Sequence, residues 1–120
     1  MNLDLTICIP TYNRPKLLSE CLDSVIDSII YSNLDVKILI SDNFSETSYE
    51  DVVNNKLKKY SQITYFKNNE NVRDFNFYLC VKRAKTKYVW IFSDDDIMKK
   101  NAILSLNTSF SDKDNLILCN

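Results

Sequence analysis

Short apolar segments alternate with longer amphipathic segments along nearly the whole chain, and this alternation restricts the fold more than any other feature. The apolar segments have the composition of buried strands and comprise residues 3–10, 36–40, 63–66, 88–92 and 116–119. The segments between them have helical patterns and comprise residues 15–30, 49–60, 74–85 and 102–106. Such alternation favours a parallel or mostly parallel sheet flanked by helices. We predict one α/β domain over residues 1–120.

The helical segments carry start signals and apolar faces. Pro15 suits the first position of a helix, because its missing N–H group would be unpaired there. Ser48 with Asp51 three residues later resembles a capping box at the start of the second helix. The stripe predicted for the first helix consists of two rows, Leu17, Cys21, Val25 and Ile29 beside Leu18, Leu22, Ile26 and Ile30. The face predicted for the third helix consists of Phe77, Cys80, Val81 and Ala84.

The last two strands carry further expectations. Residues 88–92 form an unbroken apolar run, so we predict a central strand that is covered on both faces. The chain ends in or just after the apolar run at 116–119. Natural domains seldom end in this way, which indicates a truncated domain from a longer protein.

The composition excludes several classes of function. The sequence contains no His, which rules out His general bases, Ser-His-Asp triads and His metal ligands within these residues. It contains no Gly, which rules out the Gly-rich loops that bind phosphates. A formal net charge of −1 argues against nucleic acid as a partner. No apolar run approaches the ~18 residues of a membrane-spanning helix, and no N-terminal pattern resembles a secretory signal.

The Cys residues have the surroundings of core side chains. Cys8, Cys21, Cys80 and Cys119 lie inside apolar runs and show no Cys-x-x-Cys spacing. Free Cys in such runs behaves as a small apolar side chain. We predict reduced core thiols of a cytosolic protein rather than disulfides or a zinc site.

Polar residues collect where the predicted strands end. In open parallel sheets, ligands bind beyond the carboxyl ends of the strands. The residues at that edge, in chain order, are Thr11, Tyr12, Asn13, Arg14, Asp42, Asn43, Asn71, Arg73, Asp94, Asp95 and Asp96. This polar and acidic edge is the predicted binding site.

Three consecutive carboxylates, Asp94 to Asp96, are the sharpest signal on this edge. They repel one another more strongly as they lose solvent, so a buried cluster calls for a cation. Hard oxygen ligands suit Mg²⁺ or Mn²⁺. Asp94 and Asp96 point the same way if the chain stays extended there. The alternative is a solvated turn that caps the next helix, because Asp-x-Asp is a short motif.

The other edge residues also have structural explanations. Asp42 at a strand end can cap a turn through its own backbone. Tyr12 can stack on a nucleobase or cover the edge of the sheet. Arg73 can bind a phosphate, or it can pair with Asp74 or Glu70 on the surface.

Two other α/β families fit the sequence poorly. A phospho-acceptor receiver domain has an acidic pair after its first strand, where this chain has Pro10 and Thr11. A phosphatase of the haloacid dehalogenase type has Asp-x-Asp-x-Thr after its first strand. Here Asp-x-Asp follows the fourth strand, and Met98 occupies the Thr position.

Four motifs in register resemble the family 2 glycosyltransferases, which have the GT-A fold, a Rossmann-like sheet flanked by helices. The motifs are residues 6–14 (TICIPTYNR), 40–43 (ISDN), 68–76 (NNENVRDFN) and 88–96 (YVWIFSDDD). Their order and separation are similar to the family's nucleotide-sugar half over nearly the whole chain. The closest resemblance is to the bacterial enzymes that add sugars to lipopolysaccharide O-antigen or capsule.

The resemblance implies a nucleotide-diphosphate sugar as donor, with a UDP-sugar favoured, and a saccharide or lipid-linked acceptor. The residues that it implies for the nucleotide are Pro10, Thr11, Tyr12, Asn13, Asp42, Arg73, Asp94 and Asp95. Tyr12 is implied to lie near the base, Asp42 to accept a hydrogen bond from it, and Arg73 to hold nucleotide or diphosphate. Asp94 and Asp96, above all Asp96, are implied to bind Mn²⁺ or Mg²⁺, which neutralises the leaving nucleoside diphosphate.

Two loops depart from the family's pattern. Phe44 stands where the family usually has a small residue, and residues 71–73 lack the family's Gly. Gly often supports a positive φ, so we predict that the backbone around Arg73 differs from that of the family. The consecutive Asp residues leave open which two of Asp94, Asp95 and Asp96 form the working pair.

The acceptor half of the reaction has no candidate residue in the sequence. Inverting members use a carboxylate base, and after Asp96 only Asp112 and Asp114 occur, which look like turn residues. We therefore predict donor and metal sites of a metal-assisted, inverting enzyme whose base lies beyond residue 120. The alternatives are a non-catalytic nucleotide-binding module and, less favoured, a nucleotidyltransferase, which typically has a Gly-rich loop. The resemblance implies a cytoplasmic protein at the cytoplasmic face of the inner membrane, and an exposed strand edge favours homo-oligomers.

Overall fold

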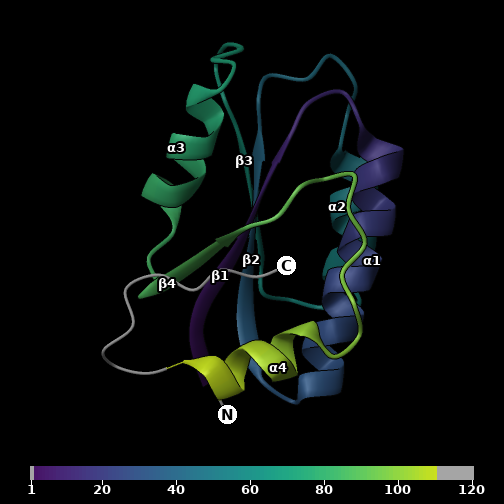
Figure 1. Ribbon diagram of the computed structural model, residues 1–120. Coiled ribbons are helices and arrows are strands. Elements are labelled where there is room, and N and C mark those ends of the chain that lie inside the picture. The colour runs from purple at the N-terminus through teal and green to yellow at the C-terminus, as the bar shows by residue number, and fades with distance from the viewer. Residues whose placement is uncertain (1, 111–120) are drawn as a thin grey trace.

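The computed structural model describes residues 2–110, which form a parallel sheet with helices on both faces (Figure 1). The strands are β1 (Asn2–Thr11), β2 (Asp35–Asp42), β3 (Ile63–Lys67) and β4 (Tyr88–Ile91). The helices are α1 (Pro15–Ser32), α2 (Glu50–Leu57), α3 (Phe75–Arg83) and α4 (Ala102–Ser109). The predicted strand at 116–119 lies outside the described residues, as do Asp112, Asp114 and Cys119.

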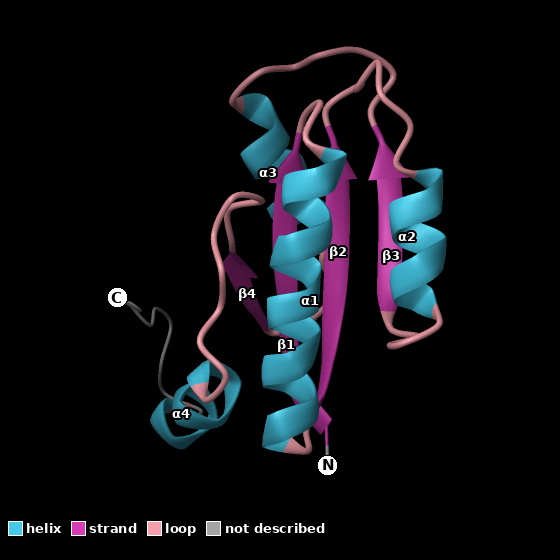
Figure 2. Ribbon diagram, turned by 90° about the vertical axis from the view of Figure 1, so that its right-hand side faces the viewer, coloured by secondary structure: helices cyan, strands magenta, loops and turns pink. Residues whose placement is uncertain are grey.

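The sheet has the strand order β3-β2-β1-β4 in the described part of the chain, and every neighbouring pair is parallel. α1 and α2 lie on one face, α3 lies on the other, and α4 packs beside α1 (Figures 1 and 2). This arrangement confirms the predicted α/β fold with a parallel sheet. β1 and β2 extend to Thr11 and Asp42, so both residues belong to strand ends rather than to loops.

Among the described strands, β4 pairs with β1, and Ile91 is exposed. The predicted central position of β4 stays a prediction, because residues 111–120 lie outside the described part of the chain. The predicted cover on both faces is found for residues 88–90: Tyr88 and Trp90 pack against the core on one side of the sheet, and Val89 packs against the cluster of Cys80 on the other. The ring of Tyr88 stacks on Phe110 at 4.3 Å, and Trp90 meets Phe92 edge to face. An apolar run reports that side chains are covered, but not by what.

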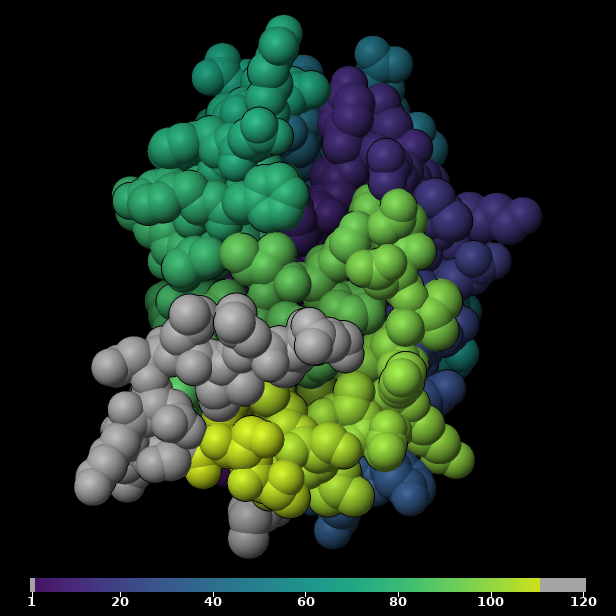
Figure 3. All heavy atoms as spheres, viewed as in Figure 1, coloured from purple at the N-terminus to yellow at the C-terminus, as the bar shows by residue number. Residues whose placement is uncertain are grey.

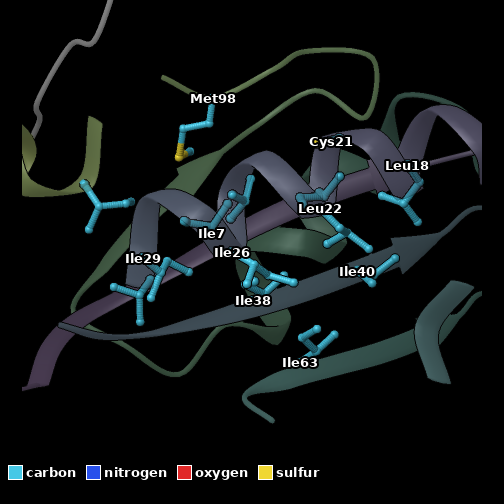
Figure 4. Packing of buried hydrophobic residues seen from close by; sticks show 14 of the residues in the cluster. Ile7, Leu18, Cys21, Leu22, Ile26, Ile29, Ile38, Ile40, Ile63 and Met98 are labelled. Carbon is cyan, nitrogen blue, oxygen red and sulfur yellow. The ribbon is translucent and has the colours of Figure 1, made fainter. Parts of the chain in front are cut away.

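The main core lies between α1 and the sheet (Figure 4). The buried residues of α1 include Leu18, Leu22 and Ile26, which pack against Ile7 of β1 and Ile38 of β2. The predicted stripe is therefore correct in its middle but not at its ends. Leu17 and Ile30, the first and last members of the two rows, are 42% and 59% exposed. Each i+4 step turns by about 40° beyond a full circle, so a four-member row drifts off the buried face.

The predicted face of α3 is correct in part. Cys80 is buried and Ala84 packs against its cluster, but Phe77 and Val81 are exposed. Asn76, which was not part of the predicted face, is buried against the sheet. Cys80 forms a small second cluster with Cys8 and Leu39. The apolar pattern failed here because hydrogen bonds of the Asn76 side chain determine which face of α3 meets the sheet.

The start of α2 also differs from the prediction. The helix spans Glu50–Leu57, and the N-cap residue Tyr49 makes no capping bond through its side chain. The Ser48 hydroxyl accepts a hydrogen bond from the Glu50 N–H group at 3.2 Å. A capping box would need the N–H group of Asp51 instead, so this part of the prediction is wrong.

α2 is attached to α1 by an ion pair with one buried partner. The Lys56 ammonium is 5% exposed and lies 2.7 Å from the Asp23 carboxylate, which Lys59 also approaches at 3.3 Å. Burial alone would raise the pKa of Asp23, but the hydrogen bonds from Lys56 and Lys59 outweigh it and lower the pKa below 3.8. The folded state therefore favours ionised Asp23.

We predict that Asp23→Asn lowers the free energy of unfolding by about 1 kcal/mol at pH 7, because buried Lys56 loses its countercharge while Asp23 is half exposed. A lowered folded pKa gives stability above the unfolded pKa that is lost as pH falls. The deficit should therefore shrink below about pH 4. Urea denaturation of both chains between pH 3 and pH 7 measures it, with Asp27→Asn as control. A deficit independent of pH would contradict the ion pair.

Candidate functional site

The carboxyl ends of β1, β2 and β3 lie at one end of the sheet (Figure 2). A cavity of about 680 Å³ opens there. The register places Thr11 beside Asp42 and Asp42 beside Lys67. β4 ends level with Cys8, so the segment after β4 runs beside the last residues of β1. The predicted site residues on the wall of this cavity are Pro10, Thr11, Tyr12, Arg73, Asp94 and Asp96.

Three chain segments contribute to this part of the surface. In Figure 3, residues of the first loop, in purple, lie between teal residues around α3 and light-green residues that follow β4. The structure thus brings together motifs that are far apart in the sequence. Asn13, Asp42 and Asp95, which were also predicted as site residues, lie next to the cavity in sequence but do not line it.

The Thr11 side chain connects β1 to the acidic turn. Its hydroxyl donates to Asp94 Oδ2 at 2.8 Å and lies 2.8 Å from the Tyr49 hydroxyl. The Tyr49 hydroxyl also accepts a hydrogen bond from the Arg14 N–H group at 2.8 Å. The Arg14 guanidinium lies 3.4 Å from Asp94 Oδ1 and 3.6 Å from Asp95 Oδ2. Four of these contacts, which join Thr11, Tyr49, Arg14 and Asp94, close a polar ring that includes the buried carboxylate of Asp94.

Asp94 and Asp95 have opposite electrostatic environments. Burial raises the pKa of Asp94 above its ordinary value, while the Thr11 hydroxyl and the Arg14 guanidinium oppose that shift. A hydrogen bond from the Ser93 hydroxyl at 2.6 Å lowers the pKa of exposed Asp95. Burial therefore disfavours the charged form of Asp94, which the Thr11 hydroxyl and the Arg14 guanidinium stabilise.

The acidic segment is a turn and not an extended strand. The Asp96 N–H group donates to the Ser93 carbonyl at 3.2 Å, which bends the chain at Asp94 and Asp95. The alternation that was predicted to align Asp94 and Asp96 therefore does not apply, although both residues line the cavity. The Cys21 thiol of α1 supports the turn through the Ser93 carbonyl at 3.4 Å. Burial and the nearby carboxylates raise the pKa of this thiol to about 12, so it stays a donor.

The residues at the turn suit a divalent cation that binds together with an anionic ligand. Within residues 2–110, no three Asp, Glu, Cys or His side chains converge as a ready-made cage. Asp96 is exposed on the cavity wall, and no described residue donates to its carboxylate. Mg²⁺ commonly binds to one or two carboxylates plus substrate phosphates rather than to a protein cage. Asp96 fits that pattern. Asp94 also fits it if the Arg14 guanidinium moves away from its carboxylate.

Asp42 and Asn13 have structural partners. The Asp42 carboxylate is fully buried, where it accepts hydrogen bonds from the Tyr65 hydroxyl and from the Ser45 N–H group. The Asn13 side chain accepts from the Glu46 N–H group at 2.8 Å. Both residues therefore hold the loop after β2 in place. Their predicted contacts with a nucleotide stay predictions.

A network of Asn side chains fixes the loop that carries Arg73. Asn43 Oδ1 accepts from the Asn68 amide at 3.1 Å and from the Val72 N–H group at 2.8 Å. Asn43 Nδ2 donates to Asn71 Oδ1 at 2.9 Å and to the Arg73 carbonyl at 3.3 Å. The network continues to α3, because Asn76 bonds to Asn68. The loop is thus held by side chains, while the Arg73 side chain remains exposed at the cavity.

The loops adopt left-handed backbone conformations without any Gly. The residues with positive φ are Asn13, Asn33, Phe44 and Arg73, and the values for Phe44 and Arg73 are 65° and 54°. Phe44 and Arg73 are the positions where the family's small residue and Gly are missing. The lack of Gly therefore does not prevent a left-handed conformation at Arg73, where the Arg73 N–H group donates a 2.8 Å hydrogen bond to Asn71 Oδ1 that supports the turn. The predicted difference from the family's backbone stays a prediction.

We predict that Phe44→Gly is more stable than Phe44→Ala by roughly 0.5–1 kcal/mol, because a Cβ atom is unfavourable at positive φ. Both variants lose the contact of Lys67 Nζ with the Phe44 ring at 5.7 Å, so that loss cancels. Urea denaturation measures the difference. At Leu104 in α4 the same pair of substitutions should favour Ala. If Ala were also the better residue at position 44, the left-handed conformation would be refuted.

We predict that Tyr49→Phe lowers the free energy of unfolding by about 1–2 kcal/mol, because it leaves the Arg14 N–H group and the Thr11 hydroxyl without a shared partner. Tyr31→Phe removes an exposed hydroxyl and should change stability by less than about 0.5 kcal/mol. Thermal and urea denaturation of the two variants provide the comparison. Equal effects of the two substitutions would argue against the polar ring.

Several residues of the site were not among the predicted site residues. Arg14 and Asn43 were predicted at the binding edge of the sheet, but no role was predicted for them. Asn76 and Phe77 were predicted only as residues of the third helix. Tyr49 was expected only as the start of a helix, and no sequence signal reported its contacts across β1. The spacing of Asn76 and Cys80 was the one available signal for the face of α3. Residues four apart lie on the same face of a helix, so a buried Cys80 indicates that Asn76 is buried as well.

Comparison with known proteins identifies related chains. The model of the glycosyl transferase family 2 matches residues 6–120. The abequosyltransferase RfbV of Salmonella typhimurium is 36% identical over 117 residues, which cover 96% of this chain and 35% of that protein. The poly(ribitol-phosphate) beta-glucosyltransferase of Bacillus spizizenii is 30% identical over 85% of this chain and 16% of its own length. The chain thus spans about a third or less of these relatives.

Solved structures share the fold. S. aureus TarS 1-349 in complex with UDP matches with a TM-score of 0.76 at 18% identity, over 88% of this chain and 31% of that chain. The mannosyltransferase PcManGT from Pyrobaculum calidifontis, in complex with GDP-Man and Mn²⁺, matches with a TM-score of 0.77 at 17% identity, over 92% and 33%. In residues 2–110, no helix has both the length and the apolar character needed to span a bilayer.

Proposed function

The chain belongs to glycosyl transferase family 2, and we propose that it forms the donor half of a metal-assisted, inverting enzyme. The proposed reaction moves a sugar from a nucleotide-diphosphate sugar to a saccharide or lipid-linked acceptor. The observation that carries this proposal is the cavity at the carboxyl ends of the strands, with Tyr12, Arg73, Asp94 and Asp96 on its wall. An aromatic ring, a free guanidinium and carboxylates suit a base, a diphosphate and its cation respectively.

Different residues of the cavity would bind different parts of the donor. Tyr12 is 41% exposed on the wall, where its ring can lie against a nucleobase. Arg73, also exposed, would bind the diphosphate. Asp96 and Asp94 would hold Mn²⁺ or Mg²⁺, whose chemistry when bound is to neutralise the charge that develops on the leaving diphosphate.

The proposed donor is a UDP-sugar. TarS has been solved with UDP and with UDP-GlcNAc, which supports UDP, whereas PcManGT has been solved with GDP-Man and Mn²⁺. Asp42 is the proposed acceptor for the base. Since Tyr65 and Ser45 occupy its two carboxylate oxygens, contact with a base requires the Tyr65 hydroxyl to move aside.

The second candidate is a nucleotide-binding module without transferase activity. It is favoured by one observation: residues 97–110 contain no Asp or Glu, so no described residue after Asp96 offers an acceptor-side base. Release of free sugar or a transfer product from UDP-sugars would contradict this candidate. By resemblance to the family, we also propose a cytoplasmic location at the inner membrane. From an exposed strand edge we propose self-association of the chain.

We predict that UDP binds in the presence of Mn²⁺ and that Asp96→Asn weakens this binding more than about tenfold, as expected for a metal ligand. Isothermal titration of UDP, with and without Mn²⁺, measures the affinity. Asp51→Asn, an exposed carboxylate on α2, makes the same charge change away from the cavity and should bind like the wild type. Absence of UDP, GDP, dTDP and CDP binding to a folded sample, with or without Mn²⁺, would refute the donor site.

A further inference from the structure

Arg14 is the cation that the fold itself places at the acidic turn. Its guanidinium pairs with Asp94 and Asp95, and it lies on the wall of the cavity beside Asp96. In the described part of the chain, Asp94 and Asp95 form no ion pair with any other basic residue. The three carboxylates of the turn are thus partly balanced by one guanidinium.

The backbone of Arg14 is fixed while its side chain is free to move. The Arg14 N–H group donates to the Tyr49 hydroxyl, and the Arg14 carbonyl accepts from the Leu18 N–H group in the first turn of α1. The side chain is 50% exposed, whereas that of Asp94 is 7% exposed. Separations of 3.4 and 3.6 Å exceed the roughly 2.7–2.9 Å of a strong charge-assisted hydrogen bond. The guanidinium can therefore leave the carboxylates without disturbing the loop.

A guanidinium and a divalent cation compete for the same oxygen atoms. Asp94 Oδ2 is held by the Thr11 hydroxyl, so Oδ1 is the atom that a cation would share with Arg14. Two positive groups on one carboxylate repel each other when no further anion is present. A diphosphate supplies that anion, and the planar guanidinium can donate to two of its oxygens at once.

We infer that Arg14 is an internal counter-cation of the acidic turn, displaced by the divalent cation and transferred to the diphosphate of the nucleotide. Arg14 is in this sense a positioning residue, and the inference rests on the proposed function. It makes the binding of cation and nucleotide interdependent. The cation alone must displace Arg14 at a cost, whereas nucleotide gives the displaced guanidinium a partner, so each ligand favours the other.

The inference predicts opposite effects of Arg14→Gln on the two ligands. Without nucleotide, the variant should bind Mn²⁺ about tenfold more tightly than the wild type, because the competing charge is gone. With saturating Mn²⁺, it should bind UDP about tenfold more weakly, because the diphosphate loses a charged partner. The electron paramagnetic resonance signal of free Mn²⁺ measures the first affinity, and isothermal titration of UDP measures the second.

Two further variants make the test specific. Arg14→Lys keeps the charge and should restore Mn²⁺ affinity to within about threefold of the wild type. Lys16→Gln, in the first turn of α1, removes the same charge from a side chain that has no ion pair among the described residues, and it should change neither affinity. Far-UV circular dichroism of each variant verifies that it is folded.

The outcomes separate this inference from the proposed function. Tighter Mn²⁺ and weaker UDP binding by Arg14→Gln alone would support it. Unchanged or weaker Mn²⁺ binding by this variant, or no Mn²⁺ binding by either chain without nucleotide, would overturn it even if UDP binds. If neither chain binds UDP but Arg14→Gln gains Mn²⁺ affinity, the displacement of Arg14 stands, while the transfer to diphosphate and the donor site both fail.

Discussion

The hydrogen bond from the Thr11 hydroxyl to the buried carboxylate of Asp94 is the contact on which the site depends. It joins the end of β1, in the middle of the described sheet, to a turn that no strand pairing holds. A buried carboxylate is costly unless donors surround it. Here the donors are the Thr11 hydroxyl and the Arg14 guanidinium, and the Tyr49 hydroxyl bonds to the Thr11 side chain and to the Arg14 backbone N–H group. The polar ring therefore determines where the loop before α1 and the turn after β4 meet.

The lack of Gly gives the loops of this chain an unusual source of rigidity. Left-handed conformations at Phe44 and Arg73 cost energy that Gly would avoid. The surrounding hydrogen bonds offset that cost: Asn43 binds the Arg73 carbonyl and the Val72 N–H group. Since side chains rather than Gly support these turns, the cavity wall is specified by residues with few alternative conformations.

Much of the fold could be predicted from the sequence, because apolar runs and apolar residues at a 3.6-residue period indicate directly which side chains are buried. The alternation of strands and helices, the parallel sheet and the buried centre of α1 follow from that signal alone. Two of the failures, at α3 and at the acidic segment, share one physical cause, which is that polar contacts override the pattern of side chains. Hydrogen bonds of Asn76 orient α3, and a turn bond at Ser93 bends the acidic segment.

The candidate site shows the same limit. Motif positions identified which residues gather at the cavity, because parallel strands bring their carboxyl ends together. They could not identify which atoms are free there. Asp42 stands at the position that the motif predicts, but its carboxylate oxygens already accept hydrogen bonds from Tyr65 and Ser45. The Asp96 carboxylate, in contrast, is free of such bonds from the described residues. The Arg14 guanidinium pairs with two carboxylates at once. The distribution of charge is the decisive difference: the turn keeps more anionic than cationic groups. Because one guanidinium neutralises only part of the negative charge of the turn, the turn still attracts a cation. The anionic ligand that binds next then balances the added positive charge.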